Sequence, residues 1–178
     1  MEISAVTAQP AGAAVSCTRS GDTLAANRDV RVFERTDQDG QHFIYGCFKP
    51  KQRVRTLGSS LAFNASFGSD VEFADLRRHK AVLIGLPARS SFSLHNLRTG
   101  ARRDVSTGEI QALKLTGAGS VAWIERSAET TRVLVTTHGH PRLLDDQPGI
   151  DPRSLTAGRQ IRWTRNGQPQ SAPLRSRR

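Results

Sequence analysis

The sequence lacks most features that would point to a particular enzyme or membrane protein. No apolar run approaches the roughly 20 residues that a membrane-spanning helix needs, so we expect no membrane span. No glycine-rich phosphate loop, no quartet of metal ligands and no set of nucleophile, base and acid occurs at a recognisable spacing. No window of useful length shows helical spacing of apolar residues. The sequence therefore indicates no cofactor, no metal and no catalytic residue.

Cysteine is scarce, with only Cys17 and Cys47 in 178 residues. In an exported protein an even pair suggests one disulfide, which would close a loop of about 30 residues and stabilise the fold by roughly 2–4 kcal/mol. The alternative is two buried free thiols in a cytoplasmic protein. Neither cysteine has the His or Asn context of a catalytic thiol.

Lysine and the aromatic residues are also few. Only four of the 26 basic residues are lysines, and Phe, Trp and Tyr together number ten, while the net charge is +10. Such a charge suits an anionic ligand such as nucleic acid, acidic polysaccharide or a membrane surface. Mutational bias in a GC-rich genome also produces a high positive charge, because it favours Arg, Ala and Gly together. The arginines are scattered along the chain and few aromatics can stack on bases, so we favour the second explanation and do not expect nucleic acid as the partner.

The best-defined pattern occupies residues 108–145. Short apolar or alternating runs are separated there by clusters of Gly, Ser and Pro, which is typical of consecutive antiparallel strands. We expect four strands, with Val121, Trp123 and their neighbours in the second. His138 and His140 follow the third, where Gly139 and Pro141 favour a turn over a metal site.

Fainter copies of this unit account for most of the remaining chain. In each, a Leu is followed six residues later by a β-branched residue and eight residues later by another apolar residue. The four copies are Leu24/Val30/Val32, Leu76/Val82/Ile84, Leu115/Val121/Trp123 and Leu155/Ile161/Trp163. Side chains alternate along a strand, so the last two positions of each copy share a face. We therefore expect Trp123 and Trp163 to be core residues.

A period near 40 residues with about four strands predicts an all-β, β-propeller-like array of about four antiparallel blades, because one sheet cannot bury its own apolar face. We place the repeat domain at 17–174, with repeats at about 17–60, 68–107, 108–147 and 149–174, followed by a basic tail at 175–178. The last repeat has only three strands. We expect the segment 15–19 to supply a fourth and close a small propeller; an open array or a fragment of a larger propeller is the alternative.

Residues 1–16 form a small, Ala-rich arm in which Ala11-Gly12-Ala13 resembles an A-x-A cleavage site. A basic n-region and an apolar h-region are missing, and Met1 is followed by Glu2. We hypothesise that Met1 is a misplaced or truncated start and that the arm is a signal-peptide remnant or a disordered arm. An extracytoplasmic or secreted protein is then expected, with a cytoplasmic one as the alternative.

Two turn motifs have a chemical and a structural interpretation. Asp37-x-Asp39-Gly40 begins like a calcium loop, but the further oxygen ligands that such a loop needs are absent, so we predict a hairpin turn. Asn166-Gly167 is a strong hairpin signal.

From Leu24 to Leu174 the sequence resembles secreted bacterial β-propeller-like proteins of the TolB-like and WD-repeat-like kind. The resemblance rests on the repeat spacing, on the Asn-Leu-Arg-Thr-Gly turn at 96–100 and on Trp-Thr-Arg-Asn-Gly at 163–167. There is no Trp-Asp dipeptide, kelch double glycine or quinone-type signature. The resemblance implies loop-lined faces and a central channel that could take proteins, sugars or small ligands.

The leading hypothesis is thus a noncatalytic extracytoplasmic binding or scaffold module with a protein or small-ligand partner. One alternative is a hydrolase or lyase that uses the channel, whose acids would be Glu34 and Glu125, ten residues after the Leu of their repeats. Another alternative is a binder of an anionic polymer.

Overall fold

The computed structural model describes residues 16–18, 21–61, 71–77, 80–85, 90–116, 119–136 and 140–174. In these ranges four antiparallel sheets are built from consecutive strands. The first sheet contains β1 (Asp22–Ala26), β2 (Val30–Thr36), β3 (Gln41–Phe48) and β4 (Arg53–Leu61), with the 3-10 helix η1 (Lys49–Lys51) before β4. The second contains β5 (Val71–Arg77), β6 (Lys80–Gly85), β7 (Ser91–Asn96) and β8 (Arg102–Ser106). The third contains β9 (Glu109–Leu115), β10 (Val121–Ser127), β11 (Thr130–Thr136) and β12 (Pro141–Asp145). The fourth contains β13 (Ile150–Ala157), β14 (Gln160–Arg165) and β15 (Gln168–Pro173).

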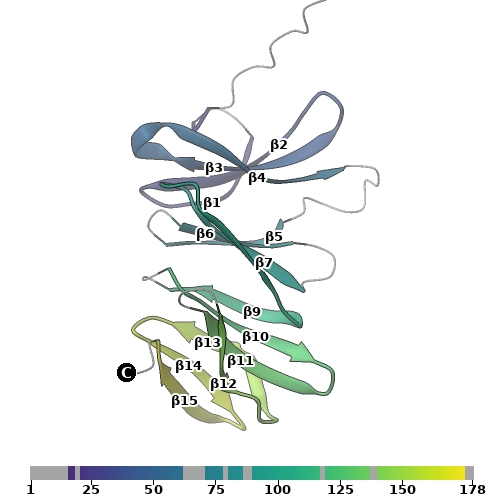
Figure 1. Cartoon of the computed structure of the whole chain (residues 1–178), viewed down its shortest axis with the longest axis vertical. Helices are drawn as coiled ribbons and strands as arrows, with labels where there is room; N and C mark the ends of the chain where they lie inside the picture. The colour runs from purple at the N-terminus through teal and green to yellow at the C-terminus, as the bar shows by residue number, and fades with distance from the viewer. Residues whose placement is uncertain are drawn as a thin grey trace, which may run out of the picture.

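The sheets stack on one another in chain order, and the first and fourth lie at opposite ends of the molecule (Figure 1). Contacts between sheets include those from β1 to β5, from β5 to β9 and from β9 to β13, so the first strands of the sheets are neighbours. The predicted all-β array of antiparallel blades is confirmed. The signal remnant and the basic tail stay predictions, because residues 1–15 and 175–178 lie outside the described ranges.

The turns form where local chemistry predicts them. Asp37 accepts hydrogen bonds at Oδ1 from the backbone N–H groups of Asp39 and Gln41, both at 2.9 Å, which closes the β2–β3 hairpin. Asn166 and Gly167 adopt positive φ angles of 49° and 75°, as a two-residue hairpin loop between β14 and β15 requires. The hairpin interpretation of both motifs is confirmed.

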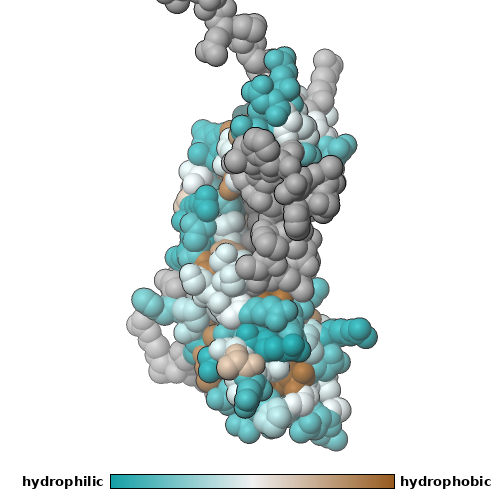
Figure 2. All heavy atoms as spheres, turned by 90° about the vertical axis from the view of Figure 1, so that its right-hand side faces the viewer, coloured by the Kyte–Doolittle hydropathy of each residue, from teal (hydrophilic) through white to brown (hydrophobic). Residues whose placement is uncertain are grey.

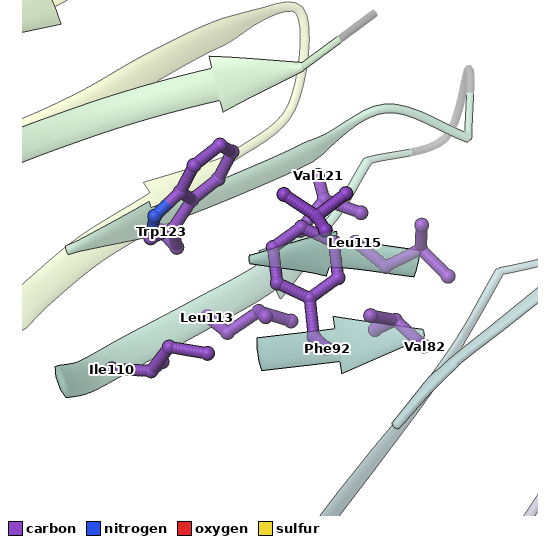
Figure 3. Packing of buried hydrophobic residues seen from close by; sticks show 8 residues of the cluster. Val82, Phe92, Ile110, Leu113, Leu115, Val121 and Trp123 are labelled. Atoms are coloured by element: carbon purple, nitrogen blue, oxygen red, sulfur yellow. The ribbon is translucent and has the colours of Figure 1, made fainter. Parts of the chain in front are cut away.

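Each pair of neighbouring sheets shares an apolar core. Val32, Ile44 and Leu97 pack between the first and second sheets. Phe92 and Trp123 pack between the second and third (Figure 3), with ring centroids 5.3 Å apart in an edge-to-face arrangement. Between the third and fourth sheets the cluster contains Ala122, Ile124, Val133, Val135, Ile150, Leu155, Ile161 and Trp163. On the face shown in Figure 2, described hydrophobic residues come to the surface only in small separate patches among hydrophilic ones.

The repeated apolar positions do not face the same way in all four sheets. Val121 and Trp123 of β10 pack toward the second sheet, and Ile161 and Trp163 of β14 pack toward the third, so both pairs face the preceding sheet. Val30 and Val32 of β2 instead face the following sheet. Val82 of β6 also faces the following sheet, as its place in one cluster with Trp123 shows. A one-residue slip along a strand moves every side chain to the other face. Matching the four repeats by their six-then-two spacing therefore introduces such a slip between the first two repeats and the last two.

The structural counterpart of Trp123 in the first sheet is therefore Phe33, one residue beyond Val32. Phe33 lies on the outer face of the first sheet, where it packs with Cys17 and Cys47. Arg31 covers this face with its guanidinium 4.5 Å from the Phe33 ring centroid and donates hydrogen bonds to the carbonyls of Cys17 and Gly21. The short segment 16–18 thus takes the place that a preceding sheet has elsewhere in the stack.

A disulfide joins Cys17 to Cys47 of β3, with the two Cα atoms 5.5 Å apart. The bond expected from the cysteine pair is present, and it holds the covering segment on the outer face of the first sheet. The expectation that segment 15–19 closes the propeller is not met by its described residues. Cys17 packs against the outer face of the first sheet, at the end of the stack remote from β15 (Figure 1).

The open edge of the fourth sheet is itself poorly suited to a further strand. In a hairpin the pairs alternate between hydrogen-bonded and non-hydrogen-bonded. Pro169, Ser171 and Pro173 pair with Thr164, Arg162 and Gln160, the non-hydrogen-bonded set, so their backbone groups point away from β14. Proline has no N–H, and Arg142 of β12 already donates to the Pro173 carbonyl at 2.8 Å. Only Ser171 retains an N–H at these three positions, which is consistent with the three strands of this sheet in the described ranges.

Candidate functional site

The two repeat tryptophans each have a buried acid as hydrogen-bond partner. Trp123 Nε1 donates to Glu125 Oε2 at 2.8 Å, and the backbone N–H of Gly108 donates to the same oxygen at 3.0 Å. Trp163 Nε1 donates to Oδ2 of Asp145, the last residue of β12, at 2.8 Å. These contacts satisfy the polar end of each indole inside the core, which a buried Trp requires.

The two acids proposed for a channel enzyme are not brought together. Glu125 is buried and committed to Trp123 and Gly108. Glu34 lies on β2 and is paired with Nδ1 of His42 from β3. The two carboxylates belong to the first and third sheets, with the second sheet between them (Figure 1). The arrangement does not place a pair of carboxylates across one cleft, as glycoside hydrolysis needs.

The histidine motif after β11 lies only partly within the described residues. His140 is exposed, and His138 lies outside the described residues. Among the residues that the structure describes, no group of three or more His, Cys, Asp or Glu side chains could hold a metal ion.

A buried Ser–His pair lies on β7, where sequence reasoning did not find it. Nε2 of His95 and Oγ of Ser93 are 2.8 Å apart, and His95 is only 5% exposed. Burial, assisted by Arg102 on the neighbouring strand β8, lowers the pKa of His95 to about 4 against a smaller opposing effect of Asp104. The imidazole is therefore neutral near pH 7 and a weak base, unlike a general base tuned to that pH. The i, i+2 spacing on a strand was a visible signal, but the burial was not.

The lowered pKa of His95 makes stability dependent on pH. The unfolded chain binds a proton at this histidine near pH 6.5, whereas the folded chain resists protonation until about pH 4. We expect the free energy of unfolding to fall by up to about 3 kcal/mol between pH 6.5 and pH 4 on account of this group, since each unit of difference between the two pKa values corresponds to about 1.4 kcal/mol. Urea titrations at several pH values would measure the loss.

The matched comparison is His95→Gln against His140→Gln. His95→Gln should flatten the pH dependence relative to the wild-type protein, whereas the exposed His140 should leave it unchanged. Equal pH slopes for the wild-type protein and His95→Gln would show that this histidine does not carry the effect.

Two arginines of β4 bind the β7–β8 turn of the next sheet, and we call this region the β4–turn junction (Arg53, Arg55 and residues 97–100). Arg53 Nη1 donates to the Arg98 carbonyl at 3.4 Å, and Arg55 Nη2 donates to the Thr99 carbonyl at 3.2 Å. Gly100 has a φ of 90°, and a side chain there would collide with the Arg55 guanidinium. The glycine therefore lets the turn accept an arginine lying flat against its backbone.

A second cationic surface lies at the other end of the molecule. An open hollow of about 540 Å³ on the fourth sheet is lined by Thr156, Ala157, Gly158, Arg159, Gln160 and Arg162. Apart from the half-buried Ala157, its lining residues are exposed. This hollow is therefore a surface concavity without a buried polar group.

No protein-family model matches the chain, and no curated protein matches it. Among solved structures, the chain is similar to the Pyrococcus horikoshii acylaminoacyl peptidase, with a TM-score of 0.47 and 7% sequence identity. The similarity covers 76% of this chain and 26% of the peptidase chain, so the present chain spans about a quarter of that protein's length. At this level of similarity the peptidase says nothing about what the chain does.

Proposed function

We propose that the chain is a noncatalytic extracytoplasmic binding or scaffold module, related to secreted bacterial β-propeller-like proteins of the TolB-like and WD-repeat-like kind. The observation that carries the proposal is that several carboxylates of the described residues serve the scaffold. Glu125 and Asp145 hold the repeat tryptophans, while Asp37 closes a turn. The stacked sheets are a rigid support, and their turns are the parts free to meet a partner.

The compartment is supported by the disulfide. Disulfides persist in oxidising environments and are rare in the bacterial cytoplasm, and the Cys17–Cys47 bond is buried against Phe33. Within the described ranges, no helix is long and apolar enough to cross a membrane.

Site-specific photo-crosslinking of the oxidised chain would test the proposed role. A photoreactive residue would replace Asp39 in the β2–β3 turn or Arg98 in the β7–β8 turn, with Arg162 on the face of β14 as the control. Exposure to an extracytoplasmic extract should give products of discrete mass from at least one turn position and not from Arg162. No discrete product from either turn would contradict the proposal.

The enzyme alternative is tested separately with Glu34→Gln and Glu125→Gln. We expect no hydrolysis of ester, glycoside or peptide substrates by the wild-type protein beyond that of either variant. Turnover that disappears in Glu34→Gln, whose carboxylate is not needed for the core, would establish an enzyme.

A further inference from the structure

The β4–turn junction brings two positive charges together on one strand face. Arg53 and Arg55 are two residues apart on β4 and pair with Phe48 and Gly46 of β3. Phe48 packs into the core shared with the second sheet, so both arginines extend toward that sheet. Their guanidinium groups reach the carbonyls of successive residues, Arg98 and Thr99, and must therefore lie side by side.

These charges are not neutralised within the described part of the chain. The ion pairs found there join His42 to Glu34, Arg102 to Asp104 and Arg165 to Asp145, and none includes Arg53 or Arg55. Asp104 is the acid on the adjacent strand β8, and Arg102 occupies both of its oxygens at 2.8 and 3.0 Å. The carbonyls that hold Arg53 and Arg55 carry only partial charge, so repulsion between the two cations is incompletely offset.

The junction also leaves hydrogen-bonding capacity unused. Arg55 Nε is buried without a partner, although buried donors are normally satisfied, whereas Arg53 is exposed and the Arg55 side chain is half-buried, so an anion from solvent can meet both residues. The Arg98 side chain is exposed on the same turn, and Lys51 is exposed in η1, just before β4. An arginine fork matches the geometry of an oxyanion with several acceptor oxygens, and two adjacent forks match a doubly charged one.

We propose that the β4–turn junction is a binding site for a phosphate or sulfate group, with Arg53 and Arg55 as its principal ligands and Arg98 as a third cation at its rim. The site rests on the proposed binding role and specifies the chemistry of the partner: a molecule that carries a tetrahedral dianion. The contact of the Arg55 guanidinium with Gly100 presets the geometry, so little side-chain order has to be gained when the anion arrives.

The site is tested by titrating the protein with inorganic phosphate and, separately, with inorganic sulfate at low ionic strength. Two-dimensional NMR monitors each titration. The wild-type protein should show saturable shifts of the backbone signals of residues 53–55 and 98–100. Arg53→Gln/Arg55→Gln should weaken binding at least tenfold, whereas Arg159→Gln/Arg162→Gln, with the same loss of charge on the fourth sheet, should bind like the wild-type protein. Tighter binding in one of the two titrations would identify the group as phosphate or sulfate.

Arg53→Lys/Arg55→Lys keeps the charge and removes the forks, and it guards against a variant that simply unfolds. It should retain the native spectrum and bind more weakly than the wild-type protein. The proposal is overturned if the wild-type protein shows no saturable shifts, or if the two Gln variants lose affinity equally, which would indicate a diffuse electrostatic attraction. Such a result would leave the proposed binding role intact, since the crosslinking experiment tests that role without any anion.

Discussion

Trp123→Ala should lower the free energy of unfolding by about 3–5 kcal/mol, the usual cost of removing a large aromatic side chain from a core. Trp123 is 1% exposed and meets Phe92 edge to face between the second and third sheets. Its loss would also remove the hydrogen bond of 2.8 Å that the indole N–H donates to Glu125 inside the core. Urea unfolding followed by far-ultraviolet circular dichroism measures the change, because the signal does not depend on tryptophan fluorescence.

Trp123→Phe separates the two contributions. It keeps most of the ring contact with Phe92 but removes the N–H, so a loss of about 1–3 kcal/mol is expected, because the buried Glu125 carboxylate loses its indole donor and keeps the Gly108 N–H. Adding Glu125→Gln to Trp123→Phe should restore part of that loss, since it removes the buried charge. A cost below about 1 kcal/mol for Trp123→Ala would mean that Trp123 does not hold these sheets together.

The second large effect is expected from Cys17→Ser/Cys47→Ser. Opening the 30-residue loop should lower the free energy of unfolding by about 2–4 kcal/mol. The same change loosens the segment that covers Phe33 on the outer face of the first sheet. Thermal unfolding with and without a thiol reductant provides the measurement.

The serine variant supplies its own control in that experiment. Reductant should lower the melting temperature of the wild-type protein toward that of the variant and leave the variant unchanged. If reductant alters both proteins equally, or neither, the disulfide does not stabilise the fold.

The parts of this fold that the sequence predicted are those that depend on neighbouring residues. Strand alternation and turn chemistry located the hairpins, including those at Asp37 and Asn166, because both act over a few residues. The spacing of Trp123 and Trp163 identified them as core residues for the same reason.

The direction in which each sheet faces could not be predicted in the same way. Val32 and Trp123 occupy the same place in the six-then-two spacing, yet they face opposite neighbours in the stack. The spacing records that two residues share a face and contains no information on which sheet lies opposite that face. Only the packing of whole sheets decides that point.

The candidate site was missed because its contacts join distant parts of the chain. Arg53 and Arg55 reach turn carbonyls 45 and 44 residues away. On the sequence they belong to a population of scattered arginines, and it is the stacking of the first two sheets that gives them a common turn. Asp145 and Trp163, 18 residues apart, illustrate the same limit.

The prolines of β15 also bear on what happens when many copies of the protein are crowded together. An extended neighbour needs alternating donors and acceptors to build a cross-β ladder, and Pro169 and Pro173 withdraw two of the three donors from this edge. The sheet with the fewest strands is therefore a poor template for fibrils. We infer that the fourth sheet keeps its exposed edge without becoming a nucleus for aggregation, as prolines and other edge devices do in natural β proteins.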